Sequence, residues 1–150
     1  MRVGEYCKHG VVTIDPSADC VAIAQLMRDE HVGFLVVVQE GDPKRKPLGV
    51  VTDRDLVLQV CARDVDMHGV TAADVMSRDP LIARENDDLS DLMQAMRIDG
   101  FRRVPVVNEN GALIGIIAID DAIDVIAGLL CDVSGSIRNE QRQERRLRSG

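Results

Sequence analysis

The chain contains the same sequence pattern twice, and this internal repeat limits the folds that it can adopt. Shifting the sequence by about 69 positions places Met27-Arg28 on Met96-Arg97. After a loop that is three residues longer in the first copy, Leu48-Gly49-Val50-Val51 aligns with Ile114-Gly115-Ile116-Ile117. Two copies of one unit predict a pseudo-twofold body with equivalent clefts where the copies meet, and such clefts are common binding sites for small ligands. Function is therefore expected in the cleft residues and in the differences between the copies.

The hydrophobic pattern of each copy predicts a strand, a helix, two strands and a second helix. Apolar residues recur at helical spacing in the predicted helices, whereas residues 33–38 are almost continuously apolar, as in a strand buried on both faces. In the first copy we expect strands at 11–14, 33–38 and 48–51, and helices at 19–30 and 53–62. In the second copy we expect strands at 81–83, 104–107 and 113–117, and helices at 89–96 and 120–130.

These elements predict a mixed α/β (α+β) fold in which small mixed sheets are covered by helices. We expect one β-α-β-β-α repeat at 2–61, a linker at 62–79, the second repeat at 80–130, and an Arg-rich helical tail at 131–150. Within the linker, Thr71-Ala72-Ala73-Asp74 resembles a capping box, which predicts a short helix after Thr71.

The charge and the scarcity of aromatic residues argue against nucleic acid as a partner. The net charge is −7, and residues 138–150 hold five Arg and two Glu, so residues 1–137 carry about −10. An acidic body repels nucleic acid and phosphate unless basic side chains are gathered locally. Aromatic residues make up only 2% of the chain, which leaves no series of rings for stacking single-stranded nucleic acid. The tail could contact RNA or anionic lipid, but its interleaved Arg and Glu first predict a solvated helix.

The cysteines and the apolar segments predict neither a metal site nor a membrane span. The four cysteines are far apart, and Cys7 and Cys20 align with apolar residues of the other copy, which predicts buried free thiols. Cys7 and His9 lack further ligands that would complete a metal site. No apolar run reaches the roughly 18 residues of a membrane helix, and no secretory leader is recognisable. We expect a cytoplasmic protein.

Three strings, found in duplicated order, resemble the tandem CBS-domain family. They are Gly49-Val50-Val51-Thr52-Asp53-Arg54-Asp55, Val75-Met76-Ser77-Arg78-Asp79-Pro80 and Arg103-Val104-Pro105-Val106-Val107. The similarity covers about residues 2–130. Such a pair forms a Bateman module, which, as the resemblance implies, binds adenosine-containing ligands between its repeats and often dimerises into a flat disc. The implied ligands are AMP, ADP, ATP, NAD or S-adenosylmethionine, with no required cofactor.

The resemblance places a first ligand site, site A, where a carboxylate of one copy faces two arginines of the other. Asp55 is the expected ribose ligand because one carboxylate can accept hydrogen bonds from both hydroxyls of a diol, and Thr52 lies beside it. The alternative is that Thr52 is a helix N-cap and Asp55 a first-turn acid, and both roles can coexist. Site A comprises Thr52 and Asp55 from the first copy, and Arg102, Arg103, Pro105 and the backbone of the strand at Ile82 from the second.

The arginine pair of site A is expected to contact the ligand phosphate. Arg102 and Arg103 are neighbours at the start of a strand, where adjacent side chains normally point to opposite faces. Pro105 suggests an irregular or edge start that would allow both to face one cleft. The alternative is a pair of solvent-exposed arginines.

The second site, site B, departs from the family pattern. It combines Ala118 and Asp121 from the second copy with Thr13, Gly33 and Phe34 from the first. Ala118 replaces a Ser or Thr, and Gly33-Phe34 replaces the arginine pair. We therefore expect site B to be weaker for phosphates, empty, or adapted to a less anionic adenosyl group. Phe34 packs either against a ligand ring or simply in the core.

No catalytic machinery is recognisable, and we expect a regulatory protein that is not an enzyme. His9, His31 and His68 are isolated from one another, and neither a Gly-rich phosphate loop nor a Ser/His/Asp arrangement is present. We expect a homodimer that signals through a separate, unknown effector protein. The alternative is a ligand-free dimeric scaffold that acts through its surfaces and its basic tail.

Overall fold

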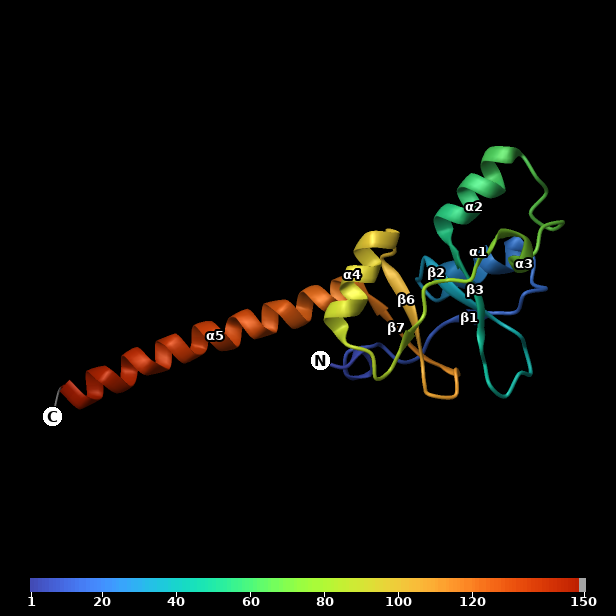
Figure 1. Cartoon of the computed structure of the whole chain (residues 1–150). Helices are drawn as coiled ribbons and strands as arrows, with labels where there is room; N and C mark the ends of the chain where they lie inside the picture. Colours follow the sequence, from blue (N-terminus) through green and yellow to red (C-terminus); the bar gives the residue numbers. More distant parts are fainter. Residues whose placement is uncertain (149–150) are drawn as a thin grey trace.

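The computed structural model describes residues 1–148 as two small sheets with covering helices, from which one long C-terminal helix projects (Figure 1). The first sheet has the order β1-β2-β3-β4 and the second the order β5-β6-β7. In each sheet the first two strands are parallel and the next pair is antiparallel. This arrangement confirms the predicted mixed α/β fold with one unit present twice.

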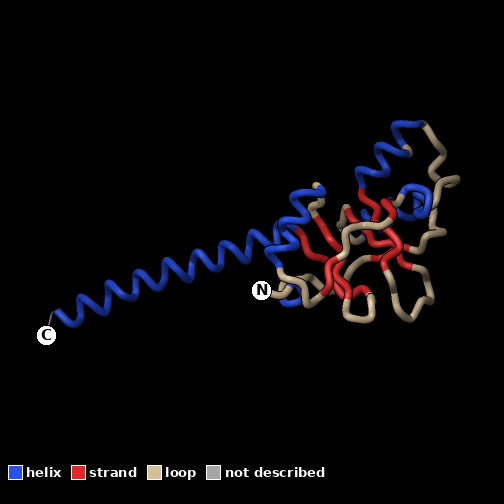
Figure 2. The backbone as a smooth tube through the Cα atoms, in the orientation of Figure 1, coloured by secondary structure: helices blue, strands red, loops and turns tan. Residues whose placement is uncertain are grey.

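The elements follow the predicted order in both copies (Figure 2). The first copy contains β1 (Thr13–Ile14), α1 (Cys20–Asp29), β2 (Phe34–Val38), β3 (Pro47–Thr52), α2 (Asp53–Gln59) and the 3-10 turn η2 (Cys61–Arg63). Between the copies lie α3 (Ala72–Val75), with the predicted capping box at Thr71 and Asp74, and β4 (Ser77–Arg78). The second copy contains β5 (Ala83–Arg84), α4 (Leu89–Asp99), β6 (Arg103–Val107), β7 (Leu113–Ala118) and α5 (Ile119–Arg148).

Strand β2 is buried on both faces because helices cover one face and the other repeat covers the other. Leu35 and Val37 pack with α1 in the core of the first repeat. Phe34, Val36 and Val38 point the other way and form a cluster with Leu113 from the second repeat. This shared cluster joins the two sheets, which is why the predicted strand is apolar at every position rather than at alternate ones.

The segment that precedes each repeat completes the other repeat. Residues 3–7, which include the 3-10 turn η1 (Val3–Glu5), place Val3 and Cys7 in the core of the second repeat. Lys8 exchanges backbone hydrogen bonds of 2.8 and 2.9 Å with Ile116 of β7. In the reverse direction β4 pairs with β3, and α3 buries Ala72 and Val75 in the core of the first repeat.

Two glycines allow these leading segments to approach closely. A Cβ atom on Gly49 would lie 2.8 Å from the carbonyl oxygen of Ser77, and one on Gly115 would lie 2.9 Å from that of Lys8. These positions are equivalent in the two copies. Both glycines are therefore needed for the two repeats to interlock.

The structure differs from the sequence expectation mainly at strand ends and in the C-terminal helix. The strands predicted at 11–14 and 81–83 are each only two residues long: β1 keeps the last two predicted residues, and β5 begins at the last one, Ala83. The predicted closing helix and the first 18 tail residues form one continuous helix, α5, of 30 residues. Residues 149 and 150 of the predicted tail lie outside the described residues.

Cys7 and Cys20 are buried free thiols, as predicted, and burial raises the pKa of both. None of the helices within residues 1–148 is both long and apolar enough to cross a membrane.

The close approach at Gly115 predicts a stability effect. In Gly115→Ala the new methyl group meets Cys7 Sγ at 2.7 Å and the Lys8 carbonyl at 2.9 Å, so the leading segment must shift. We expect the free energy of unfolding, measured by urea denaturation, to fall by about 1–3 kcal/mol. Gly128→Ala is the control, since no atom outside the neighbouring backbone of its own helix lies within 4 Å of its Cβ position and alanine favours a helix. A Gly115→Ala protein as stable as the wild type would contradict this interlocking.

Candidate functional site

Two cavities lie where the repeats meet, at the positions expected for sites A and B. Cavity A has a volume of about 340 Å³ and lies between the start of α2 and the start of β6. Cavity B has a volume of about 390 Å³ and lies between the start of α5 and the start of β2. Phe34 and Arg103 line both cavities. Because Phe34 pairs with Thr52 and Arg103 pairs with Ala118, these two residues occupy equivalent places in the two repeats.

The first wall of cavity A is the N-terminus of α2. Thr52 is the N-cap, and its side chain accepts a hydrogen bond of 3.2 Å from the Asp55 N–H. Asp55 Oδ2 in turn accepts hydrogen bonds from the N–H of Thr52 at 2.8 Å and from its hydroxyl at 3.0 Å. The capping role that the sequence left open is therefore present. Asp55 Oδ1 has only a 3.4 Å contact with Gln59 Nε2, so this oxygen is the less engaged of the two.

The opposite wall carries the arginine pair. Arg102 precedes β6 and Arg103 is its first residue, and both line cavity A. The chain bends at Arg102, whose carbonyl oxygen accepts a 2.9 Å hydrogen bond from Ile119, so the regular alternation of side chains begins only after it. Both arginines are exposed, and neither guanidinium forms a hydrogen bond or an ion pair with another of residues 1–148.

An apolar surface lies between the two charged walls. It is formed by Val50, Pro80, Leu81, Phe101 and Pro105, with Phe34 at the edge. Leu81 lines the cavity in place of Ile82, which is 37% exposed and lies outside the lining. The difference follows from the late start of β5 at Ala83, which leaves residues 81 and 82 outside the strand.

Cavity A also contains charges that sequence reasoning did not assign. Asp53 and Arg54, the first two residues of α2, line it together with Ser77. Three arginines and two aspartates therefore surround cavity A. Basic side chains are gathered at this point of an otherwise acidic chain. Asp53 and Arg54 stand within the Gly49–Asp55 string, so their place in the sequence was a signal that they lie beside Asp55.

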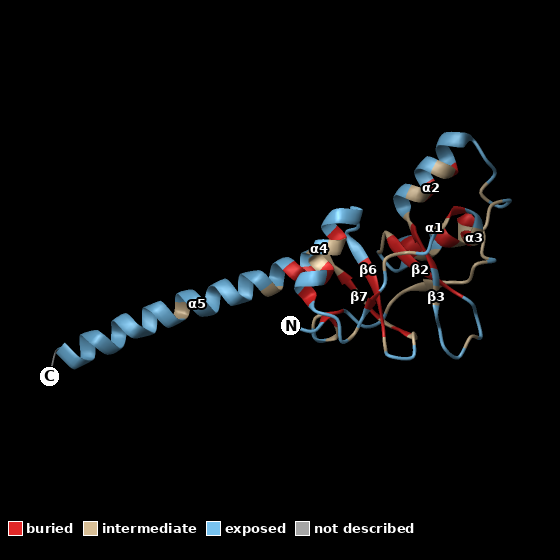
Figure 3. Ribbon diagram, viewed as in Figure 1, coloured by how far each residue is buried: buried red, intermediate tan, exposed pale blue. Residues whose placement is uncertain are grey.

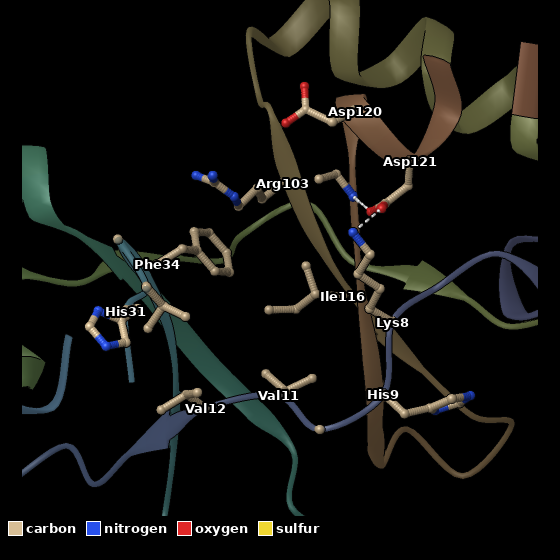
Figure 4. A pocket seen from close by; sticks show the side chains of 14 residues that line it. Lys8, His9, Val11, Val12, His31, Phe34, Arg103, Ile116, Asp120 and Asp121 are labelled. Atoms are coloured by element: carbon tan, nitrogen blue, oxygen red, sulfur yellow. Dashed lines mark hydrogen bonds and ion pairs between the residues drawn. The ribbon is translucent and has the colours of Figure 1, made fainter. Parts of the chain in front are cut away.

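Cavity B is arranged differently because its carboxylate is already paired (Figure 4). Asp121 is only 7% exposed, and its Oδ1 lies 2.6 Å from Lys8 Nζ. Its Oδ2 accepts a 2.8 Å hydrogen bond from the N–H of Ala118, but no hydroxyl is present as in cavity A. The hydrogen bond to Asp121 and the charge of its carboxylate raise the pKa of Lys8 above its ordinary value.

The other residues expected in site B are partly rearranged. Gly33, Phe34, Ala118 and Asp121 line cavity B, whereas Thr13 lies beside a separate surface depression and Val11 and Val12 take its place. Phe34 is 7% exposed and belongs to the cluster that joins the repeats. It therefore packs in the core, as one of the two interpretations held, and also borders both cavities.

The internal repeat contained a signal for Lys8. The alignment that places Cys7 opposite Met76 also places Lys8 opposite Ser77. Ser77 lines cavity A and Lys8 lines cavity B, so these residues are structural equivalents. A cation in one copy thus replaces a small hydroxyl in the other, and it neutralises the carboxylate that faces it.

Possible metal ligands and histidines do not form a further cluster within residues 1–148. The described residues contain no group of three or more His, Cys, Asp or Glu that could hold a metal ion. His9 Nδ1 lies 2.8 Å from the carbonyl oxygen of Ile114, and His68 Nδ1 lies 3.2 Å from Asp19 Oδ2. His9 and the third histidine, His31, both line cavity B.

Comparison with known proteins gives related sequences and folds. A CBS domain protein of Bacillus subtilis is 36% identical over 112 residues, which cover 74% of this chain and 75% of that protein. The solved CBS domain protein of Pyrobaculum aerophilum, complexed with AMP, is 29% identical, covers 81% of this chain and 89% of its own, and has a TM-score of 0.72. The CBS domain of a bacterial CNNM/CorC family Mg²⁺ transporter, solved with ATP, is 25% identical and has a TM-score of 0.74. The match covers 85% of this chain and 88% of that one.

The family model of the CBS domain matches residues 3–61 and 72–128, once in each copy of the internal repeat. The two matches include both charged walls of cavity A and both sides of cavity B. The chain therefore belongs to the CBS-domain family and contains a pair of CBS repeats.

Proposed function

We propose that this protein senses an adenosine-containing nucleotide, which binds in cavity A and bridges the two repeats. The observation that carries the proposal is the pairing of a carboxylate from one repeat with two unpaired guanidinium groups from the other across one cavity. The proposal assigns the protein a binding role rather than a catalytic one.

The carboxylate wall suits a ribose. A ribose presents two neighbouring hydroxyl donors, and Asp55 Oδ1 keeps most of its capacity to accept them, since only Gln59 approaches it, at 3.4 Å. Oδ2 remains held by the Thr52 cap, which fixes the direction of the carboxylate before a ligand arrives. Capping and ribose binding are thus compatible uses of the same side chain.

The arginine wall suits a phosphate. A guanidinium group donates directed hydrogen bonds to phosphate oxygens, and each such charged hydrogen bond is worth roughly 1.5–3 kcal/mol. Arg102 and Arg103 need not break an existing ion pair to provide them. The apolar surface around Val50, Leu81 and Pro105 is where a purine ring would be sheltered from water.

The cavity volume favours a mononucleotide. About 340 Å³ is near the lower limit of typical ligand cavities, so the cavity matches the size of one nucleoside more closely than that of two. AMP, ADP or ATP fits this description better, because the additional phosphates of ADP and ATP can extend past the exposed arginines. The AMP and ATP complexes of the related CBS proteins support the same class of ligand.

A bridging ligand would act by favouring one relative arrangement of the repeats. It shifts the population only by the difference between its affinities for the two arrangements. The expected output is a changed surface that a separate effector protein recognises, in the context of a homodimer. The cytoplasmic location expected from the sequence stays a prediction.

The central prediction compares two equivalent capping boxes. Asp55→Ala and Asp74→Ala each remove an aspartate that holds the N–H and hydroxyl of a threonine N-cap, but only Asp55 lines a cavity. Each variant should therefore lose about 1 kcal/mol of stability. Only Asp55→Ala should also lose roughly tenfold or more in AMP affinity, measured by calorimetric titration, because it lacks the carboxylate that binds the ribose. Equal AMP affinity in both variants would contradict the ribose role.

The phosphate role predicts a dependence on ligand charge. Arg103→Ala should weaken AMP roughly tenfold or more but leave adenosine within about twofold, because only AMP carries the phosphate. Arg97→Ala, an exposed arginine on α4 away from both cavities, is the matched control. Titration with both ligands checks this. An equal loss for AMP and adenosine would show that Arg103 acts on the shape of the cavity rather than on the phosphate.

The Lys8–Asp121 ion pair predicts a second, hidden nucleoside site. In Lys8→Ala the Asp121 carboxylate loses its 2.6 Å partner, which makes it available to a ribose. We expect calorimetry with adenosine to show one additional site per chain, which AMP fills poorly because a cation has been removed. Lys44→Ala, in an exposed loop, should behave as the wild type. An unchanged stoichiometry in Lys8→Ala would mean that the ion pair is not what keeps a ribose from Asp121.

A further inference from the structure

Helix α5 carries an apolar stripe that has no role in either cavity. Five large aliphatic residues follow one another at spacings of three, four, three and four residues, and each is between 43% and 65% exposed: Ile123, Ile126, Leu130, Val133 and Ile137. Spacings that alternate between three and four residues are the heptad pattern, in which the apolar a and d positions form the core of a coiled coil. The residues that bind α5 to its own body, Ile119, Ala122 and Val125, lie mostly on a neighbouring face at the start of the helix.

The stripe continues along a part of the helix that leaves the body. Figures 1 and 3 show α5 projecting away from both sheets, with its surface exposed over most of its length. No other segment of residues 1–148 covers the stripe at Leu130, Val133 or Ile137. A single helix with Gly128 and Gly135 in its middle is marginally stable in water without tertiary contacts. A partner that buries the stripe would supply these contacts.

The charges along α5 indicate what the partner is. From residue 119 to residue 137 the helix has acidic residues but no Lys or Arg, namely Asp120, Asp121, Asp124 and Asp132. From residue 138 onward arginines dominate over two glutamates, namely Arg138, Arg142, Arg145, Arg146 and Arg148. The helix dipole accounts for such a bias only in the first and last turns. Asp132, Arg138 and Arg142 lie well inside the helix.

We propose that α5 pairs with α5 of a second copy of this chain, in antiparallel orientation, along this stripe. Antiparallel pairing brings the basic end of each helix beside the acidic half of the other, whereas parallel pairing would place like charges side by side. Two equal contacts related by a twofold axis then form one closed dimer interface. The proposal does not depend on ligand binding.

The stripe also fixes the register of the pair. With the twofold axis between Cys131 and Asp132, Leu130 of each helix lies opposite Val133 of the other. Ile126 then lies opposite Ile137, and Ile123 lies level with Glu140. In this register Glu140 and Glu144 never meet their own copies. Parallel pairing would bring each of them against itself at the core positions that continue the stripe.

The mass of the nucleotide-free particle tests the pairing. Light scattering after size exclusion at micromolar concentration should show that Leu130→Glu and Ile137→Glu each halve the particle mass of the wild type. Asn139→Glu adds the same charge to the outer face and should leave the mass unchanged. All three residues are exposed, so none of the three substitutions should unfold the body. Circular dichroism of each variant checks that the body is folded. A monomeric wild type, or a mass that neither stripe variant changes, would overturn the proposal.

Cysteine cross-linking tests the orientation. In a background with the exposed cysteines replaced, Cys61→Ser and Cys131→Ser, a mixture of Ile123→Cys and Glu140→Cys chains should oxidise to a mixed disulfide dimer. Glu140→Cys alone should not cross-link, because its two copies would lie roughly 25 Å apart at 1.5 Å per residue. Efficient cross-linking of Glu140→Cys with itself would show a parallel pair and overturn the antiparallel assignment.

Discussion

The packing of β2 against the second repeat is the contact on which both cavities depend. Phe34, Val36 and Val38 meet Leu113 across the interface and hold the two sheets at a fixed separation. The exchanged leading segments strengthen the same contact, because Lys8 pairs with β7 while β4 pairs with β3. The two repeats therefore cannot separate without breaking both sheets. The two cavities border this interface, and Phe34 and Arg103 line both of them.

Pseudo-symmetry makes the two cavities similar in shape and lets single residues make them chemically different. Asp55 and Asp121 occupy equivalent places at the start of a helix. Where cavity A has Thr52 and Ser77, however, cavity B has Ala118 and Lys8. One carboxylate is left with an accessible oxygen beside an arginine pair, while the other is neutralised by a lysine 2.6 Å away. We interpret this as one site with a carboxylate oxygen available to a ligand and one site whose carboxylate is already paired, both built on the same frame.

Sequence reasoning predicted local features well and long-range ones poorly. The repeat and its apolar periodicity predicted the element order, the Thr71 cap and the burial of Cys7 and Cys20. Five of the six residues named for site A line one cavity, namely Thr52, Asp55, Arg102, Arg103 and Pro105, and their ligand roles stay predictions. Ile82 lies outside it. The Lys8–Asp121 pair was missed because it joins residues 113 positions apart. The continuity of α5 was missed because Gly128 and Gly135 weaken the helical signal there.

The proposed contact between Asp55 and the ribose of the ligand can be tested directly by measurement. Calorimetric titration of the wild-type protein with AMP and with its 2′-deoxy analogue compares two ligands that differ by a single hydroxyl donor. The proposed contact with Asp55 predicts that the deoxy analogue binds roughly tenfold or more weakly, since a hydrogen bond to a charged group is lost. Equal affinities for the two ligands would contradict the placement of a ribose against Asp55 in cavity A.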